Sequence, residues 1–397
     1  MERGSMLCVN AISCRAGGGL NDLRNTLPIL REALLSEGWR VKVWVCAEGW
    51  AALEGVGYDM ADVVLVSSSP PLHRFISEVL LLPLQMRREG ASVIFSFSNF
   101  ILGWSRAPQL VVLRSIAFYS TIFSRKEKRG FYQALRHWFG VFASGYTVKR
   151  AKIVFCVSNT LLEAVSMKYP RYKGKLILSY LGVSPPAAKE KSEESWRILC
   201  DAYPSLNSIN RSNQYVVLNV SSYYEHKNLI TLLRALEILV DDGVPVVGVI
   251  TAGVEAYAGA ETVQILEEKR LVRRLIERGV LFDLGTVRSK NVWRLYSVSD
   301  VLSFPSILES FGHPLVEAMS VGLPVVASDI SVHREVCVEA ALYHDVLDSK
   351  ALSERIACVL YDDQVRRKLA TAGKDISKRY SWKRHSEDVA GVIRLLG

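Results

Sequence analysis

Short apolar runs alternate with longer, helix-periodic stretches along the first half of the chain. The runs cover residues 7–12, 41–46, 63–66, 93–97, 110–113 and 153–157. A strand of a buried parallel sheet reads as a continuous apolar run, and parallel strands need a long connection that is usually a helix. The alternation therefore predicts an α/β domain built on a parallel sheet.

A glycine triplet, Gly17, Gly18 and Gly19, follows the first of these runs. Glycine lets the backbone come close to a phosphate, and it equally suits a tight turn without any ligand. The triplet is not the dinucleotide-binding fingerprint, because that pattern requires a further glycine where this chain has Asp22. A hydride-transfer dehydrogenase is therefore disfavoured.

Polar residues interrupt the alternation between residues 182 and 214, where two adjacent prolines and the sequence KEKSEE predict loop or extended structure. The alternation resumes with apolar runs at residues 215–220, 246–251, 280–283 and 325–327, and helical patterns follow from residue 349. We therefore expect an N-terminal α/β domain, a linker near residues 184–194, a second α/β domain and a final helix. The expected bounds are 1–184, 195–378 and 379–397.

The composition is that of a globular protein with two ordinary domains: 397 residues, of which 49% are hydrophobic and 22% charged. The longest apolar run, residues 79–84, contains Pro83 and is far shorter than the roughly 20 residues that span a bilayer. The N-terminal residues suit a first strand better than a signal peptide, which predicts a cytoplasmic protein. The seven cysteines include no C-x-x-C pair, and no D-x-D occurs, so we expect neither a disulfide framework nor a metal site.

The net charge of +9 is concentrated in the first half of the chain. Through Glu190 there are 24 Lys and Arg against 13 Asp and Glu. A basic half indicates an anionic partner, which charge alone leaves open between a membrane surface, a lipid phosphate and nucleic acid. The chain contains no nucleic-acid-binding motif, so a nucleic-acid partner is not expected.

Residues 123–150 combine seven Lys and Arg with interleaved aromatic residues, a pattern typical of a basic helix. One face would carry Phe131, Leu135, Trp138, Phe139 and Phe142. The preferred interpretation is that this face packs into the core, and the alternative is that it docks at a membrane interface. The preceding cations could equally form a solvated charge run or contact an anionic membrane surface; they are Arg125, Lys126, Lys128 and Arg129.

Candidate chemistry is concentrated in residues 305–335. Pro314 suits the first turn of a helix and Gly322 suits its end, so a helix of about two turns is expected between them. Its free N–H groups would point into the loop that carries Glu309, where they attract anions and hydroxyl oxygens. Glu309 and Glu317 could then bracket a ligand. Taken alone, Glu309 is better explained as a solvated loop charge and Glu317 as an acidic residue that stabilises the helix near its positive end.

The sequence ESFGHPLVE resembles the E-x7-E motif of the family 4 glycosyltransferases. The surrounding pieces F-P-S, F-G-x-P, E-A-M, G-x-P-V-V-A-S-D and H-R-E-V occur in that family's order. The resemblance implies the GT-B fold, in which two Rossmann-like α/β/α domains face a central cleft. The donor would bind mainly to the second domain and the acceptor to the first, and the final helix often crosses back onto the first domain.

The resemblance also implies roles for individual residues. Glu309 would hold sugar hydroxyls, Glu317 would hold the ribose, and Lys227 would neutralise the diphosphate of the donor. The other implied donor contacts are Gly18, Gly19, Val287, Ser310, Phe311, Gly312, Leu315 and Val316.

Two positions depart from the family pattern. Ser221 and Ser222 stand where a G-R pair is usual, which weakens the expected diphosphate clamp. Residues 114–117, RSIA, stand where many members have a histidine.

The expected activity is retaining transfer of a sugar from a nucleoside diphosphate sugar to a glycan or lipid-linked acceptor, in surface polysaccharide or lipopolysaccharide synthesis. No cofactor or metal is expected, and the protein is expected at the inner face of the membrane or free in the cytoplasm. Two alternatives remain open: a non-catalytic nucleotide-sugar-binding scaffold and a nucleotide-sugar epimerase of the same fold. A donor-hydrolysis assay would separate the scaffold from the enzyme.

Overall fold

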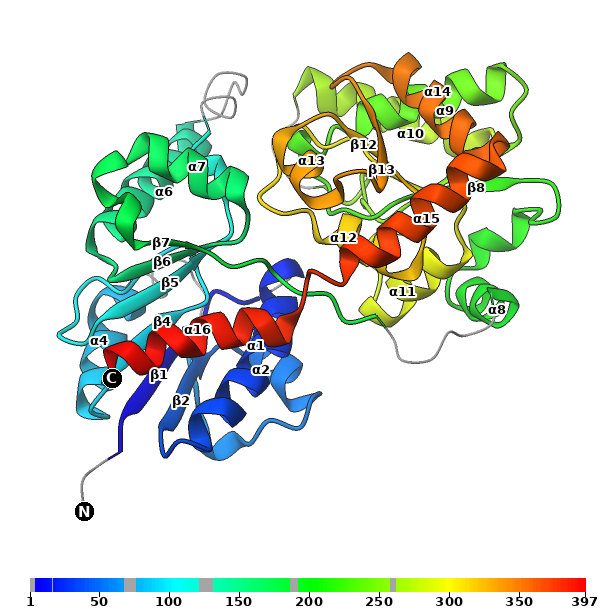
Figure 1. Cartoon of the computed structure of the whole chain (residues 1–397). Helices are drawn as coiled ribbons and strands as arrows, with labels where there is room; N and C mark the ends of the chain where they lie inside the picture. The colour runs from blue at the N-terminus through cyan, green and yellow to red at the C-terminus, as the bar shows by residue number, and fades with distance from the viewer. Residues whose placement is uncertain (1–3, 16, 68–75, 121–130, 186–191, 258–261) are drawn as a thin grey trace. The chain divides into compact units, whose positions relative to one another are not determined.

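The structure is a computed structural model that describes residues 4–15, 17–67, 76–120, 131–185, 192–257 and 262–397 (Figure 1). It forms two compact units. Unit 1 comprises Met1–Gly182 and Ser381–Gly397, and unit 2 comprises Val183–Tyr380. The basic cluster 125–129, for which a membrane contact was an open expectation, lies outside the described residues.

Unit 1 is built on a parallel sheet, which in its described residues has seven strands in the order β3-β2-β1-β4-β5-β6-β7. The strands are β1 (Met6–Ala11), β2 (Arg40–Val45), β3 (Val63–Leu65), β4 (Val93–Ser96), β5 (Gln109–Leu113), β6 (Ile153–Cys156) and β7 (Leu176–Leu178). All residues of β1 and β4 are buried, which explains why these strands read as unbroken apolar runs. The predicted parallel sheet is confirmed.

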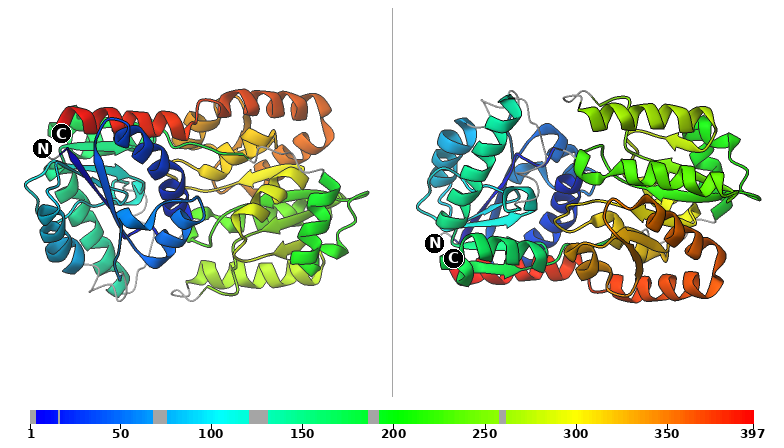
Figure 2. Two further views of the ribbon diagram at one scale, coloured as in Figure 1. Left: turned by 90° about the horizontal axis from the view of Figure 1, so that it is seen from below. Right: turned by 90° about the horizontal axis from the view of Figure 1, so that it is seen from above.

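Helices connect these strands, as a parallel sheet requires. They are α1 (Gly17–Leu35), α2 (Ala47–Glu54), α4 (Leu82–Arg88), α6 (Phe131–Arg150) and α7 (Asn159–Lys168), with the short turns η1 (Met60–Asp62), η2 (Ser77–Leu81), η3 (Ile116–Phe118) and η4 (Pro170–Lys175). The last helix of the chain, α16 (Trp382–Leu396), also belongs to unit 1 and packs against α1 (Figure 2). Ser386 Oγ donates to Thr26 O at 3.3 Å, and Ser179 Oγ lies 2.8 Å from His385 Nδ1.

The preferred interpretation of the aromatic face of α6 is wrong for the residues whose side chains are described. Trp138, Phe139 and Phe142 are 65%, 44% and 62% exposed. The buried face instead carries small residues such as Gly140 and Ser144. A Cβ added at Gly140 would lie 2.5 Å from the ring of Phe118, so this side of the helix approaches its neighbours too closely for an aromatic side chain. The large rings are therefore turned outward.

Unit 2 contains a second parallel sheet, of six strands among the residues described, in the order β10-β9-β8-β11-β12-β13. The strands are β8 (Tyr215–Asn219), β9 (Val246–Ile250), β10 (Leu281–Asp283), β11 (Val301–Phe304), β12 (Val325–Ser328) and β13 (Ala341–His344). The connecting elements are η6 (Glu225–Lys227), α9 (Leu229–Asp241), α10 (Val263–Glu277), α11 (Ser289–Val298), α12 (His313–Val321), α13 (Ser331–Cys337), α14 (Ser349–Tyr361) and α15 (Asp363–Ser377). Each sheet has the strand order of a doubly wound fold, with its loops of functional interest at the carboxyl ends of the strands.

The polar stretch between the two expected domains is more structured than predicted. It contains α8 (Ser192–Ala202) and the turn η5 (Pro204–Ser208), where loop or extended structure was expected. Glu193 and Glu194 lie in the first turn of α8, where they oppose the positive end of the helix dipole. Leu199 is fully buried, and α8 packs against α11. Glu193 and Glu194, two of the charged residues that suggested a linker, lie in the exposed first turn of an amphipathic helix, and residues 186–191 lie outside the described residues.

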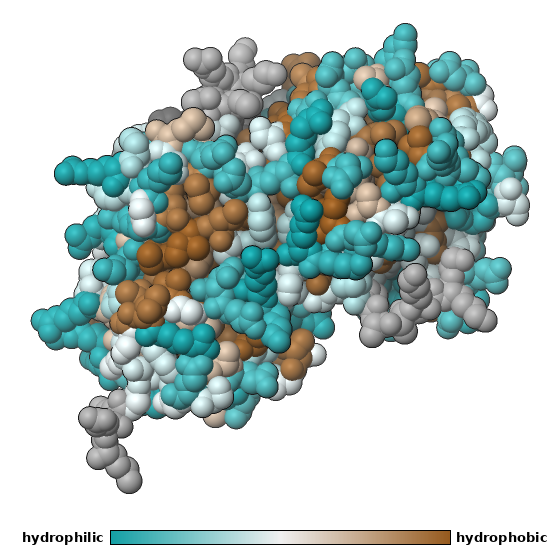
Figure 3. Space-filling view, viewed as in Figure 1, coloured by the Kyte–Doolittle hydropathy of each residue, from teal (hydrophilic) through white to brown (hydrophobic). Residues whose placement is uncertain are grey.

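The surface seen in Figure 3 is hydrophilic over most of both units. A hydrophobic patch lies on unit 1 near the strands labelled β6 and β7 in Figure 1. Strand β7 ends the sheet, and its three residues are only half-buried. No helix among the described residues is both long and apolar enough to cross a membrane.

Candidate functional site

The helix α12 starts where the motif predicts. Gly312 precedes it with φ 88°, and Gly322 ends it with φ 81°, both in the left-handed region that favours glycine. Pro314 lies in the first turn, where its missing N–H leaves no bond unmade. The backbone angle favours glycine here, and a Cβ added at Gly312 would lie 2.9 Å from Leu315 Cδ1, so that the Leu315 side chain would have to shift.

Two loops meet at the carboxyl ends of β8 and β11, in front of this helix. Asn228 has φ 54° and donates from Nδ2 to Pro305 O at 3.0 Å. The N–H of Ile307 donates to His226 O at 2.8 Å. These bonds join the loop that carries Lys227 to the loop that leads to α12, although the two are far apart in sequence.

The junction brings Lys227 and Glu309 into an ion pair. Lys227 Nζ lies 2.5 Å from Glu309 Oε1, and the two side chains are 19% and 11% exposed. Burial by itself raises the pKa of the Glu309 carboxyl, but the charges of Lys227 and His226 outweigh burial and leave that pKa below its ordinary value. The site therefore holds a fully charged carboxylate and an ammonium side by side. Whether they take the donor as expected stays a prediction.

Glu317 lies within α12, where its carboxylate accepts a hydrogen bond from Tyr296 Oη at 2.9 Å. Burial raises the pKa of Glu317 above its ordinary value, and His313 and Tyr296 oppose that shift. The sequence reasoning missed Tyr296, which lies 21 residues earlier on α11 and is almost completely buried. The ribose contact expected of Glu317 stays a prediction.

The other implied donor contacts in unit 2 differ in whether their side chains or only their backbone could contact a ligand. The side chains of Phe311, Leu315 and Val316 are buried in the core, so only their backbone could meet a ligand. The N–H of Leu315 already donates to Gly312 O at 3.0 Å. Ser310 and Val287 are half-buried in loops at the carboxyl edge of the sheet.

Asp283 stabilises the loops beside Val287 and was not singled out from the sequence. Its carboxylate accepts hydrogen bonds from the backbone N–H groups of Gly253 and Val254, each at 2.8 Å, and of Gly285 at 3.1 Å. A carboxylate that accepts several backbone N–H groups fixes the backbone around it. Its position at the end of β10 was the available signal, because side chains at that edge face a ligand site in doubly wound folds.

His333 is a second residue that was not assigned a role. Burial lowers its pKa to about 4, so the ring is neutral near pH 7. Nδ1 lies 2.9 Å from Ser328 O, and we assign the proton to Nδ1 because a carbonyl can only accept. Nε2 is buried and has no hydrogen-bond partner among the described residues.

Ser221 and Ser222 stand in place of the usual glycine-arginine pair, and Ser221 bonds within unit 2. Ser221 Oγ donates to Asn219 Oδ1 at 2.9 Å, and the Ser221 N–H donates to Thr251 Oγ1 at 3.1 Å. The loop after β8 is thus tied to the loop after β9, and Lys227 is the cation that this loop presents. Among the residues described, no three His, Cys, Asp or Glu side chains gather in a way that could hold a metal ion.

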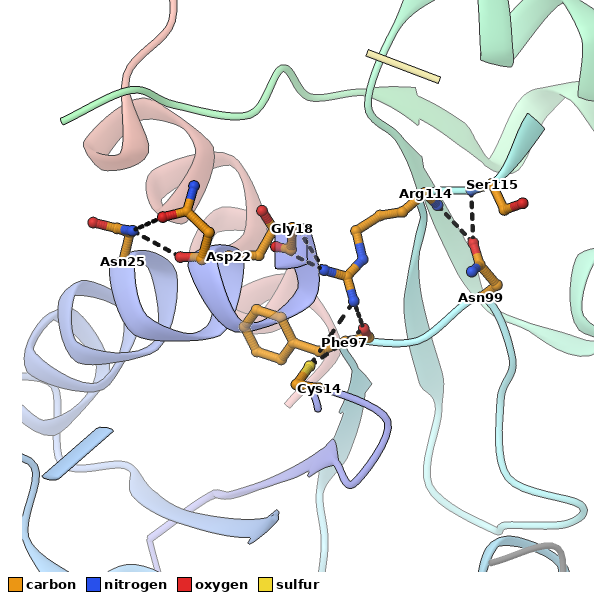
Figure 4. A network of polar contacts seen from close by, with 9 residues as sticks. Cys14, Gly18, Asp22, Asn25, Phe97, Asn99, Arg114 and Ser115 are labelled. Carbon is orange, nitrogen blue, oxygen red and sulfur yellow. Dashed lines mark hydrogen bonds and ion pairs between the residues drawn. The ribbon is translucent and has the colours of Figure 1, made fainter. Parts of the chain in front are cut away.

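In unit 1 the glycine triplet forms the first turn of α1, and Arg114 lies against it (Figure 4). Arg114 Nη1 donates to Asp22 Oδ2 at 2.8 Å and to Gly18 O at 3.3 Å, while Nη2 donates to Phe97 O. A Cβ at Gly19 would lie 3.2 Å from Nη2. Where many family members have a histidine, this chain therefore has Arg114, whose guanidinium supports the glycine turn. Whether Gly18 and Gly19 meet a donor stays a prediction.

Two contacts hold Arg114 in position: Asn99 bonds to its backbone, and the buried Asp22 pairs with its side chain. Asn99 Oδ1 accepts from the N–H groups of Arg114 and Ser115, at 2.7 and 2.9 Å. Asp22 is 2% exposed, so it is an almost fully buried carboxylate beside the guanidinium. Burial lowers the pKa of Arg114, but Asp22 and Cys14 raise it more, and the group stays charged.

Comparison with known proteins finds a family model that matches part of unit 2, relatives that match parts of the chain, and solved structures that share the whole fold. Residues 207–376 match the model of the family described as glycosyl transferases group 1. O-antigen chain mannosyltransferase B of Escherichia coli is 30% identical over 246 residues, which are 62% of this chain and 61% of that protein. Phosphatidyl-myo-inositol mannosyltransferase of Mycobacterium leprae is 41% identical over 87 residues, 21% of this chain and 23% of that one. The chain thus spans about three fifths of the first relative and a quarter of the second.

Solved structures share the fold over nearly the whole chain. Alr3699/HepE of Anabaena, solved in complex with UDP and glucose, aligns with a TM-score of 0.74 and 18% identity over 99% of this chain and 100% of that one. WaaG, a glycosyltransferase involved in lipopolysaccharide biosynthesis, aligns with a TM-score of 0.67 and 15% identity over 98% and 99%. These likenesses confirm the expected fold class, GT-B with two Rossmann-like domains.

Proposed function

We propose that this chain, whose residues 207–376 belong to the group 1 glycosyl transferases, moves a sugar from a nucleoside diphosphate sugar to a glycan or lipid-linked acceptor. The observation that carries the proposal is the Lys227–Glu309 ion pair at the carboxyl edge of the unit 2 sheet. It supplies a cation for a diphosphate and a carboxylate for sugar hydroxyls, next to the start of α12.

The chemistry that this edge would supply is electrostatic stabilisation of the leaving diphosphate. Negative charge builds up on the diphosphate as the sugar departs, and Lys227 and the N–H groups at the start of α12 would oppose it. On donor binding, the Lys227 ammonium exchanges Glu309 for phosphate oxygens. Glu309 can then accept hydrogen bonds from the sugar, and Glu317 from the ribose. The E-x7-E pattern supports retention of the anomeric configuration, and no cofactor or metal is included in the proposal.

The relatives narrow the donor and the pathway that we propose. One is named an O-antigen chain mannosyltransferase, and another structure holds UDP and glucose. We therefore place a mannosyl or glucosyl donor first, and cell-surface polysaccharide or lipopolysaccharide synthesis as the setting.

An anionic membrane surface at the cytoplasmic face is the partner that we propose for unit 1. The excess of Lys and Arg in the first half of the chain supports it, and so do the exposed rings of Trp138 and Phe142 on α6. A lipid-linked acceptor would be met at such a surface.

The test is a donor screen followed by an activity assay. Thermal shift with GDP-mannose, UDP-glucose and their nucleoside diphosphates should identify the donor, which is then supplied with and without a lipid-linked acceptor while nucleoside diphosphate release is measured. Lys227→Ala should abolish most release, whereas Lys368→Ala, an exposed lysine on α15, should not. Full activity of Lys227→Ala would show that the phosphate assignment is wrong.

The same assay distinguishes sugar transfer from the alternative function, a non-catalytic scaffold. Two departures from the family pattern favour a non-catalytic nucleotide-sugar-binding protein: Ser221 and Ser222 replace the usual glycine-arginine pair, and residues 114–117 lack the histidine. Donor binding without release of nucleoside diphosphate under any condition would favour that scaffold role over sugar transfer.

A further inference from the structure

A pocket of about 430 Å³ lies in unit 1 at the edge of the sheet opposite the glycine turn. It opens at the amino ends of three neighbouring parallel strands: Gln109 begins β5, Lys152 precedes β6, and Lys175 precedes β7. Ligands of doubly wound folds bind at the carboxyl ends. This pocket is therefore separate from the candidate site for sugar transfer.

The lining of the pocket is cationic. Arg150, Lys152 and Lys175 contribute positive charges, and no acidic residue is among the described residues that line it. The surrounding sequence extends this charge: residues 149–175 contain seven Lys and Arg and one acidic residue, Glu163. Such a concentration of one sign in a concave site attracts anions.

The pocket walls are held in place by hydrogen bonds. Gln109 accepts from the Leu102 N–H at 2.8 Å and donates to Leu102 O at 3.3 Å, which fixes the loop that carries Trp104. Tyr146 Oη donates to Gly103 O at 2.5 Å on the same loop. The site is thus shaped before any ligand arrives.

Lys175, which lines the pocket, caps the carboxyl end of α6. Its Nζ donates to Lys149 O at 3.0 Å and to Ala151 O at 2.7 Å. The ammonium opposes the negative end of the helix dipole, which would otherwise repel an anion. An ammonium has three donors, so one remains beyond these two bonds.

An exposed aromatic stripe of α6 runs toward this pocket. Trp138 and Phe142 stack with ring centroids 6.0 Å apart, and they are 65% and 62% exposed. Tyr146 follows Phe142 at a spacing of four residues, so it lies on the adjacent part of the same helix surface, and it lines the pocket. Apolar rings beside a cationic pocket match a molecule with a charged head and an apolar body.

We propose that the pocket binds the phosphate-bearing headgroup of an anionic phospholipid, while Trp138 and Phe142 enter the membrane interface. Arg150 and Lys152 would pair with the phosphate, and Trp104 would pack on the headgroup carbons. Aromatic rings at headgroup depth with cations on anionic lipid are the features of an interfacial helix. The proposal rests on the membrane partner proposed above and assigns it to a particular site.

The test measures binding to vesicles. The full-length protein should co-sediment with vesicles of phosphatidylglycerol and phosphatidylcholine, and much less with phosphatidylcholine alone. An interfacial Lys or Arg contributes about 1 kcal/mol, so the variant Arg150→Gln/Lys152→Gln should bind roughly 25-fold more weakly. Both side chains are exposed, and Lys175 is left intact because it bonds to the backbone.

The matched control removes the same net charge elsewhere. Arg367 and Lys383 are 80% and 79% exposed in their side chains, and Arg367→Gln/Lys383→Gln should bind vesicles as the wild type does. If both double variants lose vesicle binding equally, the pocket is not the binding site, because the lower net charge alone would explain the loss. Trp138→Ser should also weaken binding, whereas Met167→Ser, 77% exposed on α7, should not.

Two further arms separate the sources of failure. If calorimetry shows inorganic phosphate or glycerol 3-phosphate bound at the pocket and vesicle binding is insensitive to Arg150→Gln/Lys152→Gln, a free phosphate is the ligand and the lipid proposal is overturned. If vesicles do not bind while a soluble acceptor still receives sugar, only the lipid proposal fails. If vesicles bind but no donor is ever turned over, only the sugar-transfer proposal fails.

Discussion

Glu309 stays charged inside unit 2 because Lys227 lies 2.5 Å from its carboxylate. Removing one member of a buried pair leaves the other uncompensated, at a cost of roughly 3–5 kcal/mol. Lys227→Met should therefore destabilise unit 2 by about that amount, as measured by urea unfolding. Lys227→Met/Glu309→Gln should recover most of the stability but not the activity. If the double variant is as unstable as the single one, the cost lies in packing and not in charge.

The pair also sets a pH dependence. The folded pKa of Glu309 is below its ordinary value of about 4.3, so its contribution to stability is present above that pH and is lost as the pH falls through the lower, folded pKa.

His333 should cause a second pH dependence of folding stability, at higher pH than that of Glu309. Its folded pKa is about 4 against an ordinary value near 6.5, so the unfolded state binds the proton first as the pH falls. Stability should therefore decrease between pH 6.5 and pH 4, by about 3 kcal/mol from this residue. His333→Asn keeps a donor near the Nδ1 position, and its unfolding free energy should fall less over that range than that of the wild type. Parallel pH profiles would exclude His333 as the cause.

At the scale of the element, α12 depends on the left-handed glycine that precedes it. Gly312→Ala places a Cβ 2.9 Å from Leu315 Cδ1 in a backbone conformation that costs about 1–2 kcal/mol for other residues. It should lower both stability and donor affinity, because it shifts the N–H groups at the start of the helix. Calorimetry with the identified nucleoside diphosphate measures the second effect.

Gly279→Ala is the matched control for this prediction. Gly279 has φ 68°, and nothing lies within 4 Å of an added Cβ, so it bears the backbone strain alone. It should lose only the stability that the backbone strain costs, which is less than Gly312→Ala loses, and it should keep its donor affinity. Equal affinities in the two variants would mean that the start of α12 does not contact the donor.

The helix α6 shows what an amphipathic pattern leaves open. Its sequence has an aromatic face and a small-residue face, and hydrophobicity favours burying the first. The structure buries the second, because Gly140 and Gly145 approach Phe118 and Tyr169 too closely for larger residues. Burial follows the shape of the neighbouring surface as well as hydrophobicity.

At the scale of the molecule, the last helix stabilises the first unit. Ile393 on α16 is fully buried, and α16 packs against α1. Ile393→Ala should destabilise unit 1 by about 2–5 kcal/mol through the lost packing and the cavity. Hydrogen exchange should report faster opening in α1, while exchange in α12 stays unchanged. Equal acceleration in both helices would mean that the two units unfold together.

Much of the architecture was predictable from the sequence because it depends on the local pattern of apolar residues. The strands near residues 7–12, 110–113 and 215–220 were found within one or two residues, since buried parallel strands are apolar throughout. The strands β7 and β13 were not anticipated, because they are short and only partly buried. The helix α8 is not evident from the sequence, because its charged first turn has the composition of a linker.

The sequence by itself determined the two α/β domains, the start and end of α12, and the residues around Glu309 as the place where chemistry is concentrated. Only the tertiary structure decided which side chains meet. Lys227 reaches Glu309 across 82 residues, and Arg114 reaches Asp22 across 92. Periodicity and turn signals report interactions within a few residues, whereas these pairs exist because parallel strands bring distant loops to one edge of a sheet.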